Sequence, residues 1–160
     1  MDTEWNNDAA RELVSIALVS EDGTKEFYAE RDPLPGAPSR FVLEQVYRRL
    51  DGGLAALPDT SLGLALAEFM AQQGHCEVLA DAPIDFTMLT RALSFSPSTH
   101  SSSYARHLIR DDATVMAQLE AYFAARPAEA ARRHHALIDA RALRTAWLAV
   151  HRAADHKPSK

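Results

Sequence analysis

The chain has 160 residues, of which 47% are hydrophobic and 24% charged, as expected for one soluble globular domain. The formal net charge of −5 argues against a broad basic surface for gripping nucleic acid, although local phosphate contacts remain compatible with it. The single cysteine, Cys76, excludes an internal disulfide and a cysteine-based zinc site. The sequence has no long apolar run and no signal-peptide pattern, so it predicts a cytoplasmic protein without a membrane segment.

The chain begins with two carboxylates two residues apart, Asp2 and Glu4, followed by Trp5. If residues 2–4 form a strand, both carboxylates point to the same face, because strand side chains alternate. Paired acidic groups are costly to bury unless a cation lies between them, and oxygen ligands suit Mg²⁺ or Mn²⁺. A charged, exposed terminus is the simpler explanation, so the pair gains meaning only if further carboxylates join it.

The next segment predicts a β-hairpin. Residues 12–20 are rich in aliphatic side chains, Asp22-Gly23 is a strong hairpin turn, and residues 25–30 form the returning strand. Prolines mark residues 32–38 as a loop. Ser39 is suited to cap a helix that Gly52-Gly53 would end, and a second helix is predicted over residues 61–73.

The second half of the chain alternates between one more strand and several helices. Residues 76–81 predict a buried strand, and Asp85 begins a helix over residues 85–93. The Ser-rich segment 94–103 is expected to be a loop or, near Phe95, a short irregular strand. Helices are predicted over 111–125 and 127–152, the latter broken near two histidines, before a polar tail at 153–160.

This order of elements predicts an α/β fold in a single domain spanning residues 1–152. Its mixed sheet would contain an antiparallel three-stranded unit from residues 2–4, 12–20 and 25–30, then the strand at 76–81, with helices packed on the sheet.

Two later motifs could join Asp2 and Glu4. Ligands in open α/β sheets gather beyond the carboxyl ends of strands, where Asp85 lies, although the helix dipole alone also favours an acidic residue there. His134 and Asp139 are five residues apart, and within one helix they would point roughly 140° apart. They can face one site only if His134 precedes the helix that contains Asp139. A solvated histidine pair beside a helix is the alternative.

Taken in order, Asp2-Thr3-Glu4, Asp85 and the His134 to Asp139 motif resemble the DEDDh class of 3′–5′ exonucleases, which belong to the RNase T-like superfamily. More narrowly, the stretches 2–5, 12–16, 26–29 and 135–141 are similar to a family of small bacterial 3′–5′ exoribonucleases, some of them described as polyadenylate-specific. The resemblance covers most of the chain, and the occurrence of all the motifs in one order is its most specific feature. It implies a ribonuclease H-like fold and hydrolysis of single-stranded RNA or 3′ overhangs to nucleoside 5′-monophosphates.

The resemblance also implies roles for individual residues. Four carboxylates would hold two divalent cations, Mg²⁺ or Mn²⁺, and His134 would take the proton from the attacking water. Trp5 either stacks on the terminal base or packs against the sheet. Arg132 and Arg133 either contact backbone phosphates or form a solvated face. His135 is expected to provide packing beside His134. The four expected metal ligands are Asp2, Glu4, Asp85 and Asp139.

Two positions depart from the pattern of the class. Its first strand has several apolar residues before the Asp, whereas only Met1 precedes Asp2 here, so either the start lies upstream or the first strand is short. The class often has Asn four residues before the middle Asp, where this chain has Asp81. We therefore expect Asp85 to be the ligand and Asp81 to be a supporting neighbour.

Several alternatives stay open at this point. They are a non-catalytic nucleic-acid-binding module of the same fold, an exonuclease acting on single-stranded DNA, and a metal-dependent enzyme acting on a small phosphoester. The preference for RNA rests on the family resemblance alone, as does the expectation of a homodimer.

Overall fold

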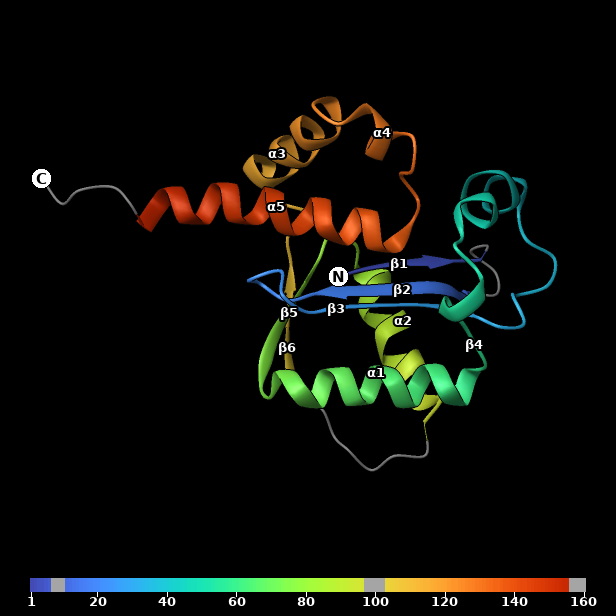
Figure 1. The fold of residues 1–160 in the computed structure, drawn as a ribbon. Helices are drawn as coiled ribbons and strands as arrows, with labels where there is room; N and C mark the ends of the chain where they lie inside the picture. Colours follow the sequence, from blue (N-terminus) through green and yellow to red (C-terminus); the bar gives the residue numbers. More distant parts are fainter. Residues whose placement is uncertain (7–10, 97–102, 156–160) are drawn as a thin grey trace, which may run out of the picture.

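The computed structural model describes residues 1–6, 11–96 and 103–155. A four-stranded mixed sheet in the order β1-β2-β3-β4 has helices on both faces (Figure 1). Helix α5 (Ala136–Asp155) packs on one face, and helices α1 (Asp59–Gln73) and α2 (Pro83–Ser94) pack on the other. The predicted mixed α/β architecture is confirmed at this level.

The centre of the sheet is the predicted hairpin. Strands β2 (Leu13–Val19) and β3 (Glu26–Arg31) are antiparallel, and Gly23 in their turn adopts a φ of +75° that favours glycine. Strand β1 (Asp2–Trp5) pairs antiparallel with the other edge of β2. Side chains of β2 alternate between the two faces, with Ile16 in the core shared with α1 and α2 and Ala17 against α5.

The helix predicted after Ser39 is present only as irregular turns. The segment contains a π-helical turn (η1, Val42–Val46), a 3₁₀ turn (η2, Tyr47–Arg49) and a second 3₁₀ turn (η3, Gly53–Ala55). Buried Val42 and Val46 pack against Val14 and account for the helical spacing of apolar residues. The chain then adds β4 (Ala56–Leu57), which pairs parallel with β3.

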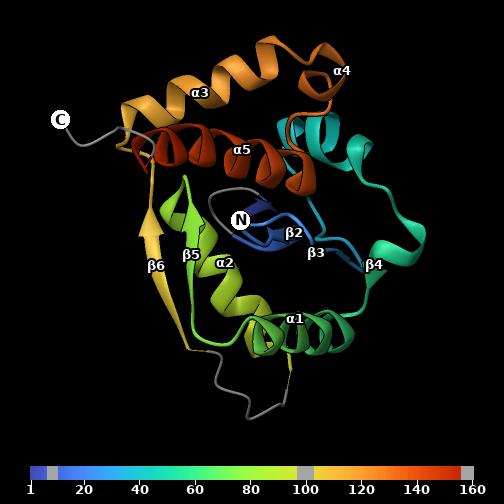
Figure 2. The ribbon, with the colours of Figure 1, turned by 60° about the vertical axis from the view of Figure 1, so that its left-hand side comes forward.

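The strand predicted at residues 76–81 forms as β5 (Cys76–Ala80), but in a separate sheet. It pairs in parallel with β6 (Tyr104–Leu108), and Figure 2 shows the two strands side by side. Among the described residues, the backbone link from β1 to β5 is a single hydrogen bond of 2.7 Å, donated by the Met1 amino group to Leu79 O. The expected joining of β5 to the main sheet is therefore wrong, because β5 forms its hydrogen-bonded ladder with β6 instead.

The alternative of a short strand near Phe95 is also wrong. Phe95 follows the end of α2 in an αR conformation, whereas the additional strand, β6, begins at Tyr104. Residues 97–102 of the predicted Ser-rich loop lie outside the described residues.

The C-terminal third is helical. Helix α3 (Ala113–Ala124) is capped by Asp112, whose side chain accepts hydrogen bonds from the first turn, and it packs along α5. A short helix α4 (Pro127–Ala130) precedes the break at the two histidines, and α5 then continues to Asp155. The tail expected from residue 153 thus begins inside α5, and residues 156–160 lie outside the described part. No described helix has the length and apolar character needed to cross a membrane.

Candidate functional site

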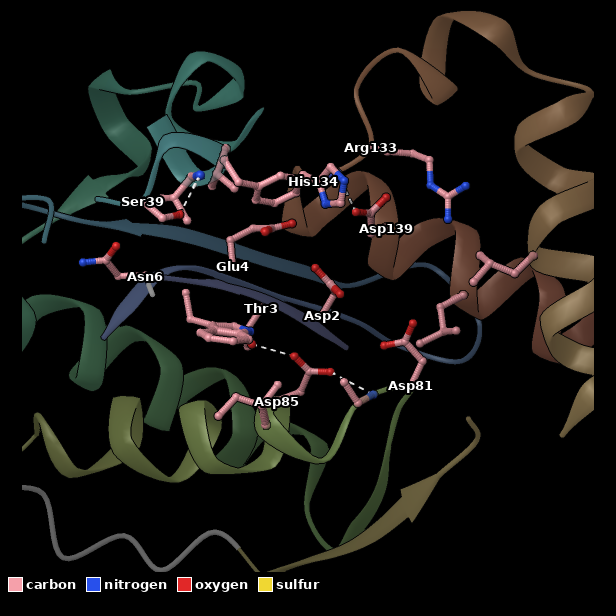
Figure 3. Close-up of a pocket in the computed structure, with 18 of the residues that line it drawn as sticks. Asp2, Thr3, Glu4, Asn6, Ser39, Asp81, Asp85, Arg133, His134 and Asp139 are labelled. Atoms are coloured by element: carbon pink, nitrogen blue, oxygen red, sulfur yellow. Dashed lines mark hydrogen bonds between the residues drawn. The ribbon is translucent and has the colours of Figure 1, made fainter. Parts of the chain in front are cut away.

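The four expected metal ligands and the expected proton acceptor line one cavity of about 480 Å³ (Figure 3). The cavity lies where β1, the 39–46 segment, the turn between β5 and α2, and the start of α5 meet. The structure therefore brings together side chains that are more than 130 positions apart in the chain. These five residues are Asp2, Glu4, Asp85, His134 and Asp139.

Strand β1 supplies the first two carboxylates through its alternation. Figure 3 shows Asp2 and Glu4 directed toward His134 and Asp139. Between them, the buried hydroxyl of Thr3 donates a hydrogen bond of 2.6 Å to Asp85 Oδ1. Asp2 Oδ2 is buried and has no hydrogen-bond partner among the described residues.

The turn between β5 and α2 supplies two more acidic groups. Asp85 lies in the first turn of α2, and its Oδ2 accepts a hydrogen bond of 3.3 Å from the Ala82 backbone N–H. Ligand atoms of Asp2, Asp81 and Asp85 all lie within 4.8 Å of one another. The structure thus gives Asp81 a place at the cavity beside Asp85, and both are candidates for holding a cation.

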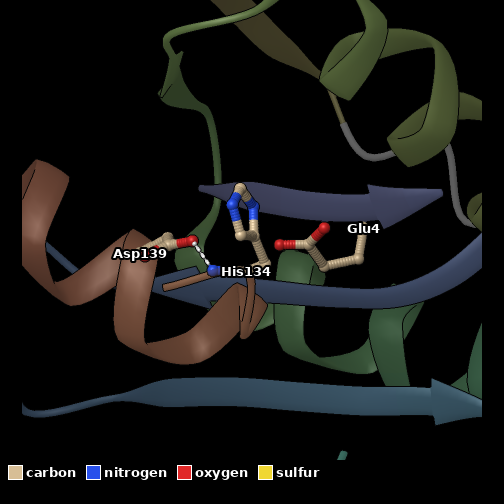
Figure 4. A group of neighbouring side chains, drawn as sticks. All are labelled: Glu4, His134 and Asp139. Atoms are coloured by element: carbon tan, nitrogen blue, oxygen red, sulfur yellow. Dashed lines mark hydrogen bonds between the residues drawn. The ribbon is translucent and has the colours of Figure 1, made fainter. Parts of the chain in front are cut away.

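The start of α5 supplies His134 and Asp139. As their five-residue spacing requires, His134 lies before the helix and Asp139 lies inside it. His134 precedes the helix in a left-handed conformation with φ of +69°, while Asp139 lies within its first turn. The backbone N–H of His134 donates a hydrogen bond of 2.8 Å to Asp139 Oδ2. Ligand atoms of Glu4, His134 and Asp139 lie within 4.8 Å of one another (Figure 4).

The cavity carboxyls hold their protons more tightly than exposed carboxyls do. Burial, followed by repulsion from Glu4, raises the pKa of Asp2 well above its ordinary value. Burial, followed by the negative charge of Asp139, raises the pKa of Glu4 from 4.5 to about 8. Burial also raises the pKa values of Asp85 and Asp139 from 3.8 to about 6, although each accepts hydrogen bonds that oppose the rise. A cation among these groups would favour their ionised forms.

The imidazole of His134 has a different environment. Burial, followed by the positive charges of Arg49 and Arg133, lowers its pKa below 6.5. The ring is therefore neutral near pH 7 and able to accept a proton. Phe41 contacts it edge-on, with ring centroids 5.0 Å apart and planes at 80°.

The three residues considered for substrate contacts differ in position. Trp5 lines the cavity and also packs against the hydrophobic core. Arg133 lines the cavity, forms an ion pair of 3.0 Å with Glu120, and lies over the ring of Phe123. Arg132 is not among the lining residues and pairs with Asp51 at 2.9 Å, so the structure does not bring it to the cavity.

His135 is 1% exposed and stacks on Tyr28 with ring centroids 4.6 Å apart. This position agrees with the expected packing role beside His134.

Sequence reasoning missed the contribution of the 39–46 segment. Ser39 and Phe41 line the cavity, together with Asn6 from the end of β1. Phe41 is 53% exposed although it lines the cavity. A regular helix was the wrong template for this segment, and no other pattern in the sequence links it to the carboxylates.

No protein-family model matches the chain, and no curated protein matches it. The geometry of the cavity therefore carries the functional argument, together with the motif order noted in the sequence.

Proposed function

We propose that the protein is a metal-dependent 3′–5′ exoribonuclease of the DEDDh class on a ribonuclease H-like fold. The observation that carries this proposal is the convergence of three separate acidic segments and one neutral histidine on a single cavity. The proposed substrates are the 3′ ends of single-stranded RNA or of 3′ overhangs, and the products are nucleoside 5′-monophosphates.

The residues present fit a pair of hard divalent cations, Mg²⁺ or Mn²⁺. The carboxylate oxygens Asp2 Oδ2 and Asp139 Oδ1 are buried and lack hydrogen-bond partners among the described residues, which is costly without a cation. The candidate ligands also fall into two groups, each with its ligand atoms within 4.8 Å. Asp2, Glu4, Asp85 and Asp139 would hold the ions, with Asp81 beside them. When bound, such ions lower the pKa of water and stabilise the leaving oxygen.

The remaining chemistry belongs to the chain. A ring nitrogen of His134 takes the proton from the attacking water, a role that requires the neutral imidazole that its surroundings favour. The backbone N–H of His134 donates a hydrogen bond of 2.8 Å to Asp139 Oδ2, so it fixes the position of this carboxylate relative to His134. The hydroxyl of Thr3 likewise holds Asp85 Oδ1 through a hydrogen bond of 2.6 Å.

The preference for RNA over DNA rests on the motif resemblance, since no described contact reads a 2′-hydroxyl. The direct test is incubation of the protein with Mn²⁺ and a 5′-labelled single-stranded RNA, beside a DNA of the same sequence. A ladder of products shortened from the 3′ end supports the proposal.

The variant Asp139→Asn keeps the shape of the side chain but removes its charge, and we expect it to abolish the ladder. Asp111→Asn changes an exposed carboxylate outside the cavity lining and is the matched control. An RNA that is bound but stays intact with the wild-type protein would instead indicate a non-catalytic binding module.

A further inference from the structure

Helix α2 and strand β6 each carry an exposed arginine, Arg91 and Arg106. Neither forms an ion pair with any residue that the structure describes, whereas Arg133 at the cavity is paired with a carboxylate. In β6, the neighbouring His107 lies 3.2 Å from Glu77, on the face of the strand opposite to Arg106. In a chain of formal net charge −5, two uncompensated cations create a locally positive surface.

Hydrogen bonds hold these side chains next to one another. Arg106 Nη2 donates a hydrogen bond of 3.2 Å to Thr90 Oγ1, and the hydroxyl of Tyr104 lies 3.3 Å from the same atom. The Arg106 guanidinium also lies over the rings of Phe86 and Tyr104, 5.8 and 5.9 Å from their centres. All these partners are neutral, so the guanidinium keeps its charge and further N–H donors. We call Thr90, Arg91, Tyr104 and Arg106 the α2–β6 strip.

The α2–β6 strip continues from the cavity. Asp85 lies in the first turn of α2 at the cavity (Figure 3), and Arg91 is six residues further, about 9 Å along the helix axis. Arg91 Nη1 donates a hydrogen bond of 2.9 Å to Arg11 O. Next to Arg11, Glu12 O accepts a hydrogen bond of 2.7 Å from the N–H of Asn6, which lines the cavity. The exposed residues of α2 include no carboxylate and are Pro83, Thr87, Thr90, Arg91 and Ser94.

We propose that the α2–β6 strip binds backbone phosphates of the RNA strand upstream of its 3′ end. The inference rests on the proposed function and names its substrate class, which is strands long enough to reach from the cavity to the strip rather than dinucleotides. Arginine side chains and hydroxyl groups hold phosphates without reading bases. The cavity itself is acidic, so a positive surface outside it supplies attraction for the rest of the strand.

The chain provides a matched control for the loss of two positive charges. Lys25 and Arg152 are exposed, form no ion pair with a described residue, and line a separate hollow at the β2–β3 turn. Neither lines the cavity. The double variant Lys25→Ala/Arg152→Ala therefore changes the net charge as much as Arg91→Ala/Arg106→Ala does, but at a different surface.

The test compares the binding of a single-stranded RNA dodecamer and a dinucleotide over a series of salt concentrations. Both RNAs carry a 5′ fluorophore and a phosphorothioate in the last linkage to slow cleavage, and Mg²⁺ is present. For the dodecamer, Arg91→Ala/Arg106→Ala should weaken binding and make the plot of log affinity against log salt shallower by about 0.7 for each lost phosphate contact, about 1.4 in total. The dinucleotide should bind to this variant and to the wild type equally. The control double variant should resemble the wild type with both RNAs.

Arg91→Lys/Arg106→Lys separates charge from structure, because it keeps both cations and should retain the wild-type salt dependence. An unchanged salt dependence in Arg91→Ala/Arg106→Ala, or an equal loss of affinity for both RNAs, would overturn the inference. So would an equal effect of Lys25→Ala/Arg152→Ala, which would indicate net charge alone.

Cleavage of the unmodified RNAs distinguishes this inference from the proposed function. If the wild type shortens both RNAs and Arg91→Ala/Arg106→Ala shortens the dodecamer with the same kcat/KM, the α2–β6 strip is refuted and the exonuclease stands. If the wild type binds the dodecamer through the two arginines without shortening it, the strip is supported and the exonuclease is refuted. A wild-type protein that binds neither RNA refutes both.

Discussion

Without divalent cations, the protein should be less stable at neutral and alkaline pH than at acidic pH. The folded state raises the pKa values of Asp85 and Asp139 from 3.8 to about 6, and that of Glu4 from 4.5 to about 8, chiefly through burial. A carboxyl with a raised pKa binds its proton more tightly in the folded state than in the unfolded state. Its contribution to stability is therefore complete below the ordinary pKa and is lost as the pH rises through the folded value.

The size of the effect follows from the shift of a single group. For Asp139, a rise from 3.8 to about 6 corresponds to about 3 kcal/mol of stability lost between acidic and neutral pH. In a domain of this size, that loss lowers the melting temperature by roughly 6–12 °C. Because the cavity carboxyls interact with one another, their individual contributions do not add.

Thermal unfolding measured between about pH 4 and about pH 8, in EDTA and in excess Mn²⁺, tests this expectation. In EDTA the melting temperature should fall as the pH rises, and Mn²⁺ should remove most of the fall. Asp139→Asn should flatten the pH dependence in EDTA, whereas the exposed control Asp111→Asn should not. A melting temperature that stays constant or rises with pH in EDTA would refute the reasoning.

Three further predictions concern the fold. Gly63→Ala in α1 should destabilise the protein by about 1–3 kcal/mol, because a Cβ there would lie 2.6 Å from the backbone nitrogen of Ser96. The control is Gly36→Ala, whose Cβ meets nothing within 4 Å. Chemical denaturation measures the free energy of unfolding of both variants. Glu30→Gln should cost about 1–3 kcal/mol in the same assay, because the buried carboxylate accepts backbone hydrogen bonds from Asp51 and Gly52. Four apolar residues added before Met1 should lengthen β1 opposite Leu18 and Val19, which have no partner on the β1 side among the described strands. The longer strand should raise the melting temperature and slow amide exchange at Leu18 or Val19. Unchanged exchange at both residues would contradict the lengthening of β1.

The β2–β3 hairpin and the start of α5 could be predicted because their signals are local. The alternating apolar residues and the Asp22-Gly23 turn determine the hairpin through short-range physics. The spacing of His134 and Asp139 required a break before the helix, and the structure has that break. Four acidic residues and one histidine chosen by motif order also lie at one cavity, although their roles remain a prediction.

Elements that depend on long-range pairing could not be predicted. Strand β6 follows a Ser-rich segment and has intermediate or exposed side chains throughout, so it lacks the apolar alternation that indicates a strand. Its partner β5 was assigned to the main sheet because a sequence does not show which strands pair with one another. The segment after Ser39 was predicted as one regular helix for a related reason, since irregular π and 3₁₀ turns imitate helical spacing.

Calorimetric titration of Mn²⁺ into the metal-free protein shows whether the cavity binds divalent cations. We predict saturable uptake of two ions per chain, which Asp2→Asn reduces and Asp111→Asn leaves unchanged. An absence of saturable uptake, or uptake that is the same in Asp2→Asn, would contradict the claim that carboxylates from three segments of the chain form a divalent-cation centre.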